Sequence, residues 1–397
     1  MSVVLADQGR HAGTVRPVFL ACMGDPNDPD TWSSTPYHLL DAGKRLGVIR
    51  EGLPLQPGRG KYRAMRLAWN ASRLLALDRP GGYQYSVGFL ESLWRPVAER
   101  VRGGVVINQF QLYPPTILHD KSVEKWFYLD ATLTLLNKHY GDAPGGRSFR
   151  ERLRRERENY HAAAGVMTMS RFAADSVVAD YGVPPSKVHV VVPGANITGE
   201  AYRQWERHVP DPTIGAVGAD APIRMLFVGR EVVRKGLDRL LEAISVGRRL
   251  GLKANLRIIG LSKEDVLPAM REIPGVEWEG PVYRRTESGR FLDLVSQCDL
   301  GCLLSRADFS AIALREYLAL GMVVLGPSVG GCADLMRPDS SIAIAADATV
   351  DQVAKALLEL EADRGRFARM RASAWEHRRS ALWDASVQQI AEILGRR

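Results

Sequence analysis

Short apolar runs rich in β-branched residues alternate along this chain with longer stretches of helical pattern. Such alternation is typical of βαβ units built around a parallel sheet. The pattern runs twice, before and after a Pro/Gly/Asp-rich stretch at 209–222, VPDPTIGAVGADAP. The expected strands are VRPVFLACMG, GGVVINQF, KWFYLDAT, AGVMTMS and KVHVVVPGA in the first half, and IRMLFVG, NLRIIG, GVEWEG, LGCLLS and MVVLGPS in the second.

With 397 residues the chain exceeds the size at which a single core keeps growing, so two domains are expected. The stretch 209–222 is the predicted linker. We therefore predict an α/β protein of two doubly wound, Rossmann-like domains that face a central cleft. Ligands of such sheets bind at the carboxyl ends of the strands, so the residues that follow each strand matter most.

Composition limits the classes of binding partner and the cellular compartment that we expect. The formal net charge of +8 favours an anionic partner, but no zinc-finger, helix-turn-helix or RNP-like pattern accompanies it, so nucleic acid is not expected. RSFRERLRRERE at 147–158 is typical of a solvated helix face. Cysteines 22, 298, 302 and 332 predict reduced, buried thiols. Without a leader or a membrane-length apolar run we expect a cytoplasmic protein, with peripheral attachment at the inner membrane face left open.

Two cations stand where a strand turns into a helix. Arg230 directly follows MLFVG, and Lys235 with Gly236 opens the helical stretch LDRLLEAI. A helix N-terminus already attracts anions and favours Asp or Glu over Lys, so a purely structural Lys235 is out of place there. Surface solvation is the alternative for each residue alone. The strand context favours an anion site.

Residues 303–335 carry the second group of chemical residues. Asp308 and Glu316 stand eight apart, and a helix is predicted to begin near Ser310, leaving backbone N–H groups at Phe309, Ser310, Ala311 and Ile312 for a phosphate. Gly330-Gly331 predicts a tight turn that lets a ligand approach the backbone. The structural alternatives are an N-cap for Asp308 and a buried arginine partner for Glu316.

These segments together resemble the retaining glycosyltransferases of family GT4, with the GT-B fold. The shared features are FVGR with a following KG, the Asp308-x7-Glu316 pair, G-x-VV, and GG-x-x-acid, together with SRFAADSVVADYGVPPSKVHVVVPGANI at 170–197. The helix at Trp383 resembles the one that returns to the first domain in that family. The expected domains are 1–208 for the acceptor, 209–375 for the donor, and 376–397 for the returning helix.

The resemblance implies a role for each matched residue. Arg230 and Lys235 would neutralise the donor diphosphate, Glu316 would bind the ribose, and Asp308 would contact the donor sugar. Gly229 of FVGR, and Ser34 in the loop where the family often carries glycines, would also line the donor site. Asp308 and Asp334 stand where the family usually has Glu, which affects sugar preference or activity.

The first half offers fewer candidates. Ser34 or Thr35 is expected to cap a helix that has Pro36 at its first position. The DPD at 28–30 suggests a metal pair of another glycosyltransferase fold, but it follows the wrong strand for that. Asp130, in FYLDAT at the end of a predicted strand, stands where the resemblance implies a residue near the reacting carbon, and its alternative is the N-cap of a helix beginning at Thr132.

The sequence therefore predicts a metal-independent enzyme of the hexosyltransferase type, which moves a sugar with retention from a UDP- or GDP-sugar to a sugar, lipid-linked or other hydroxyl acceptor. Cations and N–H groups aimed at the leaving diphosphate supply the charge stabilisation, so no cofactor beyond the donor is expected. A silent sugar-nucleotide sensor or scaffold is the alternative. An NAD enzyme ranks last, because no G-x-G-x-x-G follows a predicted strand. The oligomeric state is left open.

Overall fold

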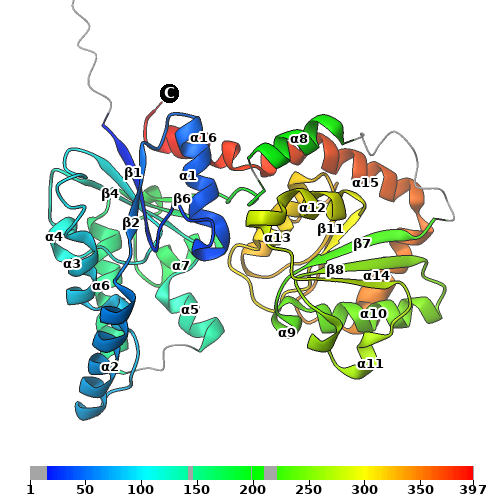
Figure 1. Cartoon of the computed structure of the whole chain (residues 1–397), viewed down its shortest axis with the longest axis horizontal. Coiled ribbons are helices and arrows are strands. Elements are labelled where there is room, and N and C mark those ends of the chain that lie inside the picture. Colours follow the sequence, from blue (N-terminus) through cyan, green and yellow to red (C-terminus); the bar gives the residue numbers. More distant parts are fainter. Residues whose placement is uncertain (1–15, 142–145, 198, 210–220, 397) are drawn as a thin grey trace, which may run out of the picture.

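The protein folds around two parallel six-stranded sheets, each covered by helices, as the computed structural model shows (Figure 1). The structure describes residues 16–141, 146–197, 199–209 and 221–396. Two doubly wound α/β sheets are what the repeated alternation of strands and helices predicts, so the expected fold class is confirmed.

The first sheet has the order β2-β1-β3-β4-β5-β6. Apolar clusters lie on its two faces, and the helices that cover them come from the segments between strands. The strands are β1 (Val18–Met23), β2 (Glu51–Leu55), β3 (Val105–Asn108), β4 (Glu124–Leu129), β5 (Gly165–Thr168) and β6 (Val188–Val190), and the helices are α1 (Thr35–Arg45), α2 (Arg59–Leu75), α3 (Val87–Trp94), α4 (Pro115–Leu118), α5 (Leu133–Tyr140), α6 (Arg147–Ala162) and α7 (Arg171–Ala179).

The second sheet has the order β12-β11-β10-β7-β8-β9. One large apolar cluster fills both of its sides. Its strands are β7 (Ile223–Val228), β8 (Ala254–Ile259), β9 (Val276–Gly280), β10 (Leu300–Cys302), β11 (Val323–Pro327) and β12 (Ser341–Ile344), and its helices are α9 (Val232–Lys235), α10 (Leu237–Arg249), α11 (Pro268–Arg271), α12 (Arg284–Ser296), α13 (Ile312–Ala319), the 3₁₀ helix η5 (Gly330–Leu335), α14 (Val350–Ala362) and α15 (Arg364–His377).

Each sheet reverses its strand order once. In the first sheet this switch point lies between β1 and β3, and in the second it lies between β7 and β10. At such a point the two loops that leave the carboxyl ends turn to opposite faces and open a crevice for ligands. The residues after β7 and β10 include Arg230, Lys235 and Asp308, so the predicted donor residues share one switch point.

The segment between the two sheets crosses earlier than predicted. Helix α8 (Glu200–His208) falls in the first of the domains expected from the sequence, yet Tyr202 packs in the core of the second sheet and donates a hydrogen bond to the Ala319 carbonyl at 3.2 Å. The chain therefore passes between the two cores before α8. The predicted end of the first domain at 208 lies after this crossing, and the domain boundary itself stays a prediction.

Helix α16 (Trp383–Ile393) runs back to the first sheet and lies beside α1 (Figure 1). Trp383 is fully buried, together with Val387 and Ile390, in the cluster that also holds Leu39 of α1. The indole N–H donates to Asn196 Oδ1 at 3.0 Å. Trp383 thus holds α16 against the first domain by packing and by one hydrogen bond.

Trp383→Ala is expected to lower the free energy of unfolding by about 3–5 kcal/mol, because it empties a closed core site and leaves the Asn196 oxygen without its donor. Chemical denaturation followed by circular dichroism measures the change. Trp32→Ala is the control, since the Trp32 side chain is 42% exposed and its loss should cost less than about 0.5 kcal/mol. Equal losses in the two variants would contradict this role for Trp383.

Candidate functional site

Lys235 and Asp308 form an ion pair at the switch point of the second sheet. Lys235 Nζ lies 2.5 Å from Asp308 Oδ2, and both side chains are mostly buried. Gly236, which follows Lys235, has a φ of +72°, and a Cβ there would lie 2.1 Å from the Leu304 carbonyl oxygen. Only glycine fits this turn, which brings α9, α10 and the loop after β10 together. Arg230, exposed just after β7, lies at the same edge of the sheet.

The Asp308 carboxylate is held by several donors. Besides Lys235, it accepts hydrogen bonds from the Ala311 N–H at 3.1 Å and from Ser305 Oγ at 3.3 Å. Helix α13 begins at Ile312 with Ala311 as N-cap, so the predicted start near Ser310 is two residues early, and the Ala311 N–H is already bonded. Asp308 therefore organises the turn before α13 and is not its N-cap. The predicted roles of Phe309, Ser310 and Ile312 stay predictions.

Gly330 and Gly331, after β11, pack tightly against the loop that follows β10. The Gly331 N–H donates to the Asp308 carbonyl at 3.1 Å, and a Cβ on Gly331 would lie 1.8 Å from the Phe309 carbonyl oxygen. η5 starts here, as the double glycine predicts. The close approach of the two loops requires glycine at 331.

Glu316 has the buried arginine partner that the sequence analysis gave as its alternative. It is 2% exposed, and both of its carboxylate oxygens accept from the Arg284 guanidinium, one of them at 2.8 Å. Arg284 begins α12 and lies 4.3 Å over the Phe291 ring. Binding of a ribose by Glu316 stays a prediction, and it would compete with this pair.

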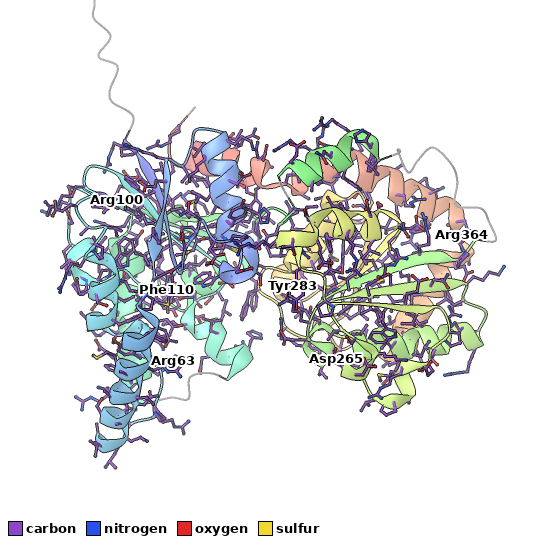
Figure 2. All side chains as sticks on the ribbon, viewed as in Figure 1. Arg63, Arg100, Phe110, Asp265, Tyr283 and Arg364 are labelled. Carbon is purple, nitrogen blue, oxygen red and sulfur yellow. The ribbon has the colours of Figure 1, made fainter. Side chains whose placement is uncertain are left out.

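Arg284 also reaches the first domain. Burial, and next the Arg284 charge, lower the pKa of His38 on α1 to about 4, so His38 is neutral at pH 7. Figure 2 shows Tyr283, the residue before Arg284, on the side of the second domain that faces the first. The sequence alone does not indicate Arg284, because its partner Glu316 stands 32 residues later in the chain.

Asp130 faces Asp308 from the first domain. It follows β4, and burial raises the pKa of its carboxyl to about 6, with a further contribution from the Asp308 charge. The N-cap of α5 is Thr132, whose hydroxyl accepts from the Leu135 N–H at 3.2 Å, so the capping alternative for Asp130 is wrong. Two carboxyl groups thus lie near each other between the domains.

Further contacts hold the two domains together beside these acids. Asp334 Oδ2 accepts from the Arg171 N–H, at the start of α7, at 2.6 Å. Phe172 and Phe309 lie nearly parallel with ring centroids 6.4 Å apart, and His139 sits edge-on to both. The shortened acid at 334 therefore binds a helix N-terminus of the first domain.

The loop after β1 differs in detail from its prediction. Ser34 precedes α1, which begins at Thr35, but its hydroxyl donates to the Pro29 carbonyl at 2.5 Å and does not cap the helix. Asp30 lies 3.4 Å from Arg285 of the second domain, and Asp28 accepts from the Asp30 N–H. A donor contact by Ser34 or Gly229 stays a prediction.

Gln109 is a candidate site residue that the sequence alone does not single out. It follows β3 at the switch point of the first sheet, is 2% exposed, and neither its amide nitrogen nor its amide oxygen has a hydrogen-bond partner in the described residues. Buried amides are nearly always paired, so a polar ligand is the natural partner. The run VVINQFQ, with amides directly after an apolar strand, is the signal that could have indicated it.

Comparison with known proteins identifies the second domain. Residues 217–377 match the family model described as glycosyl transferases group 1. This part of the chain is a group 1 glycosyltransferase domain. Relatives include the D-inositol 3-phosphate glycosyltransferases of Rhodococcus jostii, 25% identical over 227 residues, and Thermobispora bispora, 27% identical over 223 residues. These matches cover 55% and 54% of this chain, and 49% and 51% of the relatives, so the chain spans about half their length.

Solved structures of similar shape extend beyond the glycosyltransferase domain. The sucrose-phosphate synthase of Thermosynechococcus elongatus has a TM-score of 0.62 at 14% identity over 96% of this chain and 98% of its own. The Anabaena protein HepE, solved in complex with UDP, has a TM-score of 0.63 at 14% identity, over 96% of this chain and 99% of its own. At this identity the likeness shows the fold, which is GT-B.

Asp130→Asn is expected to stabilise the protein at pH 8 and to leave its stability unchanged near pH 3.5. The folded pKa of about 6 exceeds the unfolded value near 3.8, so the folded state holds the proton more tightly, and ionisation above pH 6 costs stability. The gain at pH 8 should reach about 1–3 kcal/mol. Urea unfolding at the two pH values measures it, and Asp28→Asn is the control. A gain that is the same at both pH values would contradict an ionising Asp130.

Proposed function

We propose that the protein is a retaining glycosyltransferase that moves a sugar from a UDP- or GDP-sugar to an acceptor hydroxyl. One observation carries this proposal: Lys235 and Asp308 form an ion pair at the switch point of the glycosyltransferase domain, beside the start of α10, and Arg230 follows β7 at the same edge of the sheet. Cations and helix N–H groups at that place favour a diphosphate. The UDP in the HepE complex supports a uridine donor for a protein of this fold.

In the mechanism that we propose, the donor diphosphate binds Lys235 and displaces the Asp308 carboxylate from it. Negative charge grows on the diphosphate as the sugar leaves. Lys235 and Arg230 therefore stabilise the transition state, in which this charge has developed, more than the ground state. The freed Asp308 carboxylate then lies beside the donor sugar, opposite Asp130. This chemistry is supplied by protein groups, which favours activity without a metal ion.

The acceptor would bind on the first domain. Gln109 offers an unpaired amide donor and acceptor at the switch point of that sheet, a suitable partner for hydroxyl groups. The relatives' name, D-inositol 3-phosphate glycosyltransferase, supports a polyol or sugar as the acceptor. A sensor or scaffold of the same fold would bind the nucleotide without forming product.

Lys235→Ala and Arg230→Ala are each expected to weaken UDP or GDP binding about tenfold to a hundredfold, since each removes a charge-assisted bond of about 1.5–3 kcal/mol. Isothermal titration calorimetry measures the affinity. Asp308→Asn is the informative counterpart: it frees Lys235 and removes a repulsive carboxylate, so it should bind UDP more tightly than the parent while it loses turnover. Unchanged binding in both cation variants rules out this donor site.

The transferred sugar is expected to keep the anomeric configuration of the donor. Proton NMR of the fresh product reads this from the anomeric coupling constant, and the reaction should proceed in EDTA. Glu316→Gln should reduce turnover by weakening the ribose contact. Inversion of the sugar, together with loss of at least about 10²-fold in Asp130→Asn, would instead make Asp130 a general base and would refute the retaining mechanism.

We also propose that α2 attaches the protein to an anionic membrane surface. No helix in the described residues is long and apolar enough to cross a bilayer. On α2, however, Leu67, Leu74 and Leu75 are 68%, 60% and 87% exposed, and they share one side of the helix at spacings of seven and eight. Arg63 and Arg66 lie exposed beside them. A helix with an apolar stripe and a basic flank suits a membrane interface.

Leu74→Ser/Leu75→Ser should abolish co-sedimentation with vesicles of phosphatidylcholine and phosphatidylglycerol, and should leave UDP affinity unchanged. Vesicles of phosphatidylcholine alone should bind the parent protein weakly, because the arginines then lack a charged partner. Leu250→Ser, an exposed leucine of the second domain, is the control. Loss of a dimer in the variant, measured by light scattering, would assign the stripe to a second copy of the chain instead.

A further inference from the structure

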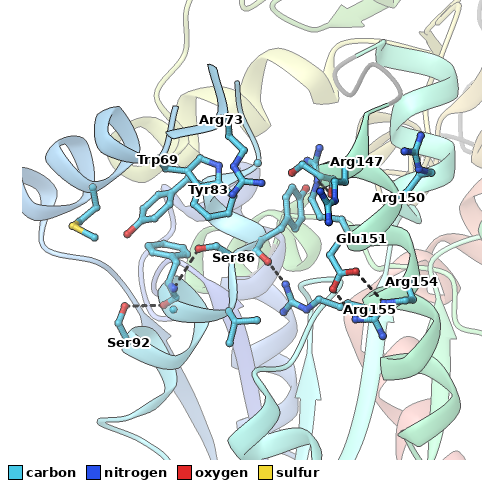
Figure 3. A pocket seen from close by; sticks show the side chains of 18 residues that line it. Trp69, Arg73, Tyr83, Ser86, Ser92, Arg147, Arg150, Glu151, Arg154 and Arg155 are labelled. Carbon is cyan, nitrogen blue, oxygen red and sulfur yellow. Dashed lines mark hydrogen bonds and ion pairs between the residues drawn. The ribbon is translucent and has the colours of Figure 1, made fainter. Parts of the chain in front are cut away.

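A cavity of about 1120 Å³ lies in the first domain, away from the donor residues. Helix α2 forms one wall and the first half of α6 the other, and the segment at 82–92, which includes the start of α3, forms its base. Figure 3 shows Trp69, Arg73 and Tyr83 on one side, and Arg147, Arg150 and Arg155 on the other. The expected solvated face of 147–158 holds for Arg147 and Arg150, which are exposed, while Arg155 is only partly exposed, and all three line the pocket.

The base of the pocket is aromatic. The Tyr83 ring centroid lies 4.9 Å from that of Phe89 and 6.1 Å from that of Trp69, and Tyr85 lines the same cavity. Tyr85 stacks on Phe110 at 5.1 Å with an interplanar angle of 13°. Phe110 lies two residues after β3, at the switch point of the first sheet. The pocket therefore adjoins the cleft and offers flat apolar surface to a ring or chain.

The walls of the pocket carry far more positive than negative charge. Six arginines and a single acid, Glu151, line it, and no lysine does. Glu151 is already taken by Arg154, whose Nη2 lies 2.6 Å from its Oε1. Arg73 stacks at 4.3 Å on the Trp69 ring. The other four arginines of the pocket form no ion pair with any described residue. These four are Arg147, Arg150, Arg152 and Arg155.

Two of these guanidinium groups are held in the wall with too few partners. Arg155 Nη1 donates to the Tyr85 carbonyl at 2.5 Å, while its Nη2 is buried without a hydrogen-bond partner. Arg152 lies 5.5 Å from the Tyr85 ring centroid and donates only to the Ser148 carbonyl, at 3.3 Å. Burial lowers the pKa of both. Both side chains are partly buried, and the acids that act on them from nearby, Asp78 on Arg152 and Glu151 on Arg155, form no ion pair with them. A partly buried cation without a bonded anion favours a negatively charged ligand.

We propose that this pocket binds a phosphate ester on an apolar or ring-shaped body and, on the basis of the proposed transferase function, that this ester is the acceptor. Several guanidinium forks suit the three free oxygens of a phosphate better than one carboxylate, which a single fork would satisfy. The aromatic base suits the body of the ester, and the link through Tyr85 and Phe110 directs its hydroxyl toward the cleft. The phosphate ester belongs either to a lipid or to a soluble sugar.

Isothermal titration calorimetry with dodecyl phosphate, glucose 6-phosphate and inorganic phosphate tests the pocket. We expect at least one ester to bind more tightly than inorganic phosphate, and Arg152→Gln/Arg155→Gln to weaken that binding at least tenfold. Arg366→Gln/Arg369→Gln is the matched control: two exposed arginines, also three apart on a helix, whose loss should change nothing. Preference for dodecyl phosphate would indicate a lipid source, and preference for glucose 6-phosphate a soluble one.

Arg147→Gln/Arg150→Gln is a second pocket variant that should fold normally, because these exposed side chains make no hydrogen bond or ion pair with the described residues. It should weaken ester binding at least fivefold. Ester binding that is unchanged in both pocket variants, or equally reduced in the control, would overturn the proposal. UDP affinity separates it from the proposed function. Loss of the pocket alone leaves UDP binding intact, whereas failure of the donor site leaves ester binding intact.

Discussion

The ion pair between Lys235 and Asp308 is the interaction on which the site depends. It joins the loop after β7 to the loop after β10, the two that the reversed strand order separates, and Gly236 and Gly331 allow the backbones to approach closely enough for it to form. A cation and an acid that neutralise each other are stable without ligand. A diphosphate that displaces the acid changes the charge on both sides of the cleft, because Asp308 also faces Asp130.

Much of the fold follows from the sequence because buried parallel strands are continuous apolar runs. The two strands that this pattern did not indicate, β2 and β12, are the outermost strands on one side of each sheet. β2 contains Pro54, which is tolerated only where the ladder ends, and β12 is the short run SIAI with a small alanine. Edge strands need less apolar surface, so their sequence signal is weaker.

The site was predictable wherever a residue's position after a strand determines its place. Asp130 and Arg230 follow the ends of β4 and β7 within two residues, and Lys235 and Asp308 lie on the segments that follow β7 and β10. Partners that are distant in the sequence were not predictable. Arg284 donates to the Glu316 carboxylate, and Asp334 accepts from the Arg171 N–H at the start of α7. The pocket beside α6 was not predictable, because Arg–Glu spacing on a helix does not show that α2 lies opposite it.

A crystal structure with UDP or GDP bound shows whether a diphosphate displaces Asp308 from Lys235. We expect the diphosphate within about 3 Å of Lys235 Nζ and the Arg230 guanidinium, with Lys235 released from Asp308. We also expect the nucleoside close to Arg284 and Glu316. A nucleotide that binds elsewhere, for example among the arginines of α6, or one that leaves Lys235 bonded to Asp308, would refute the proposed donor site.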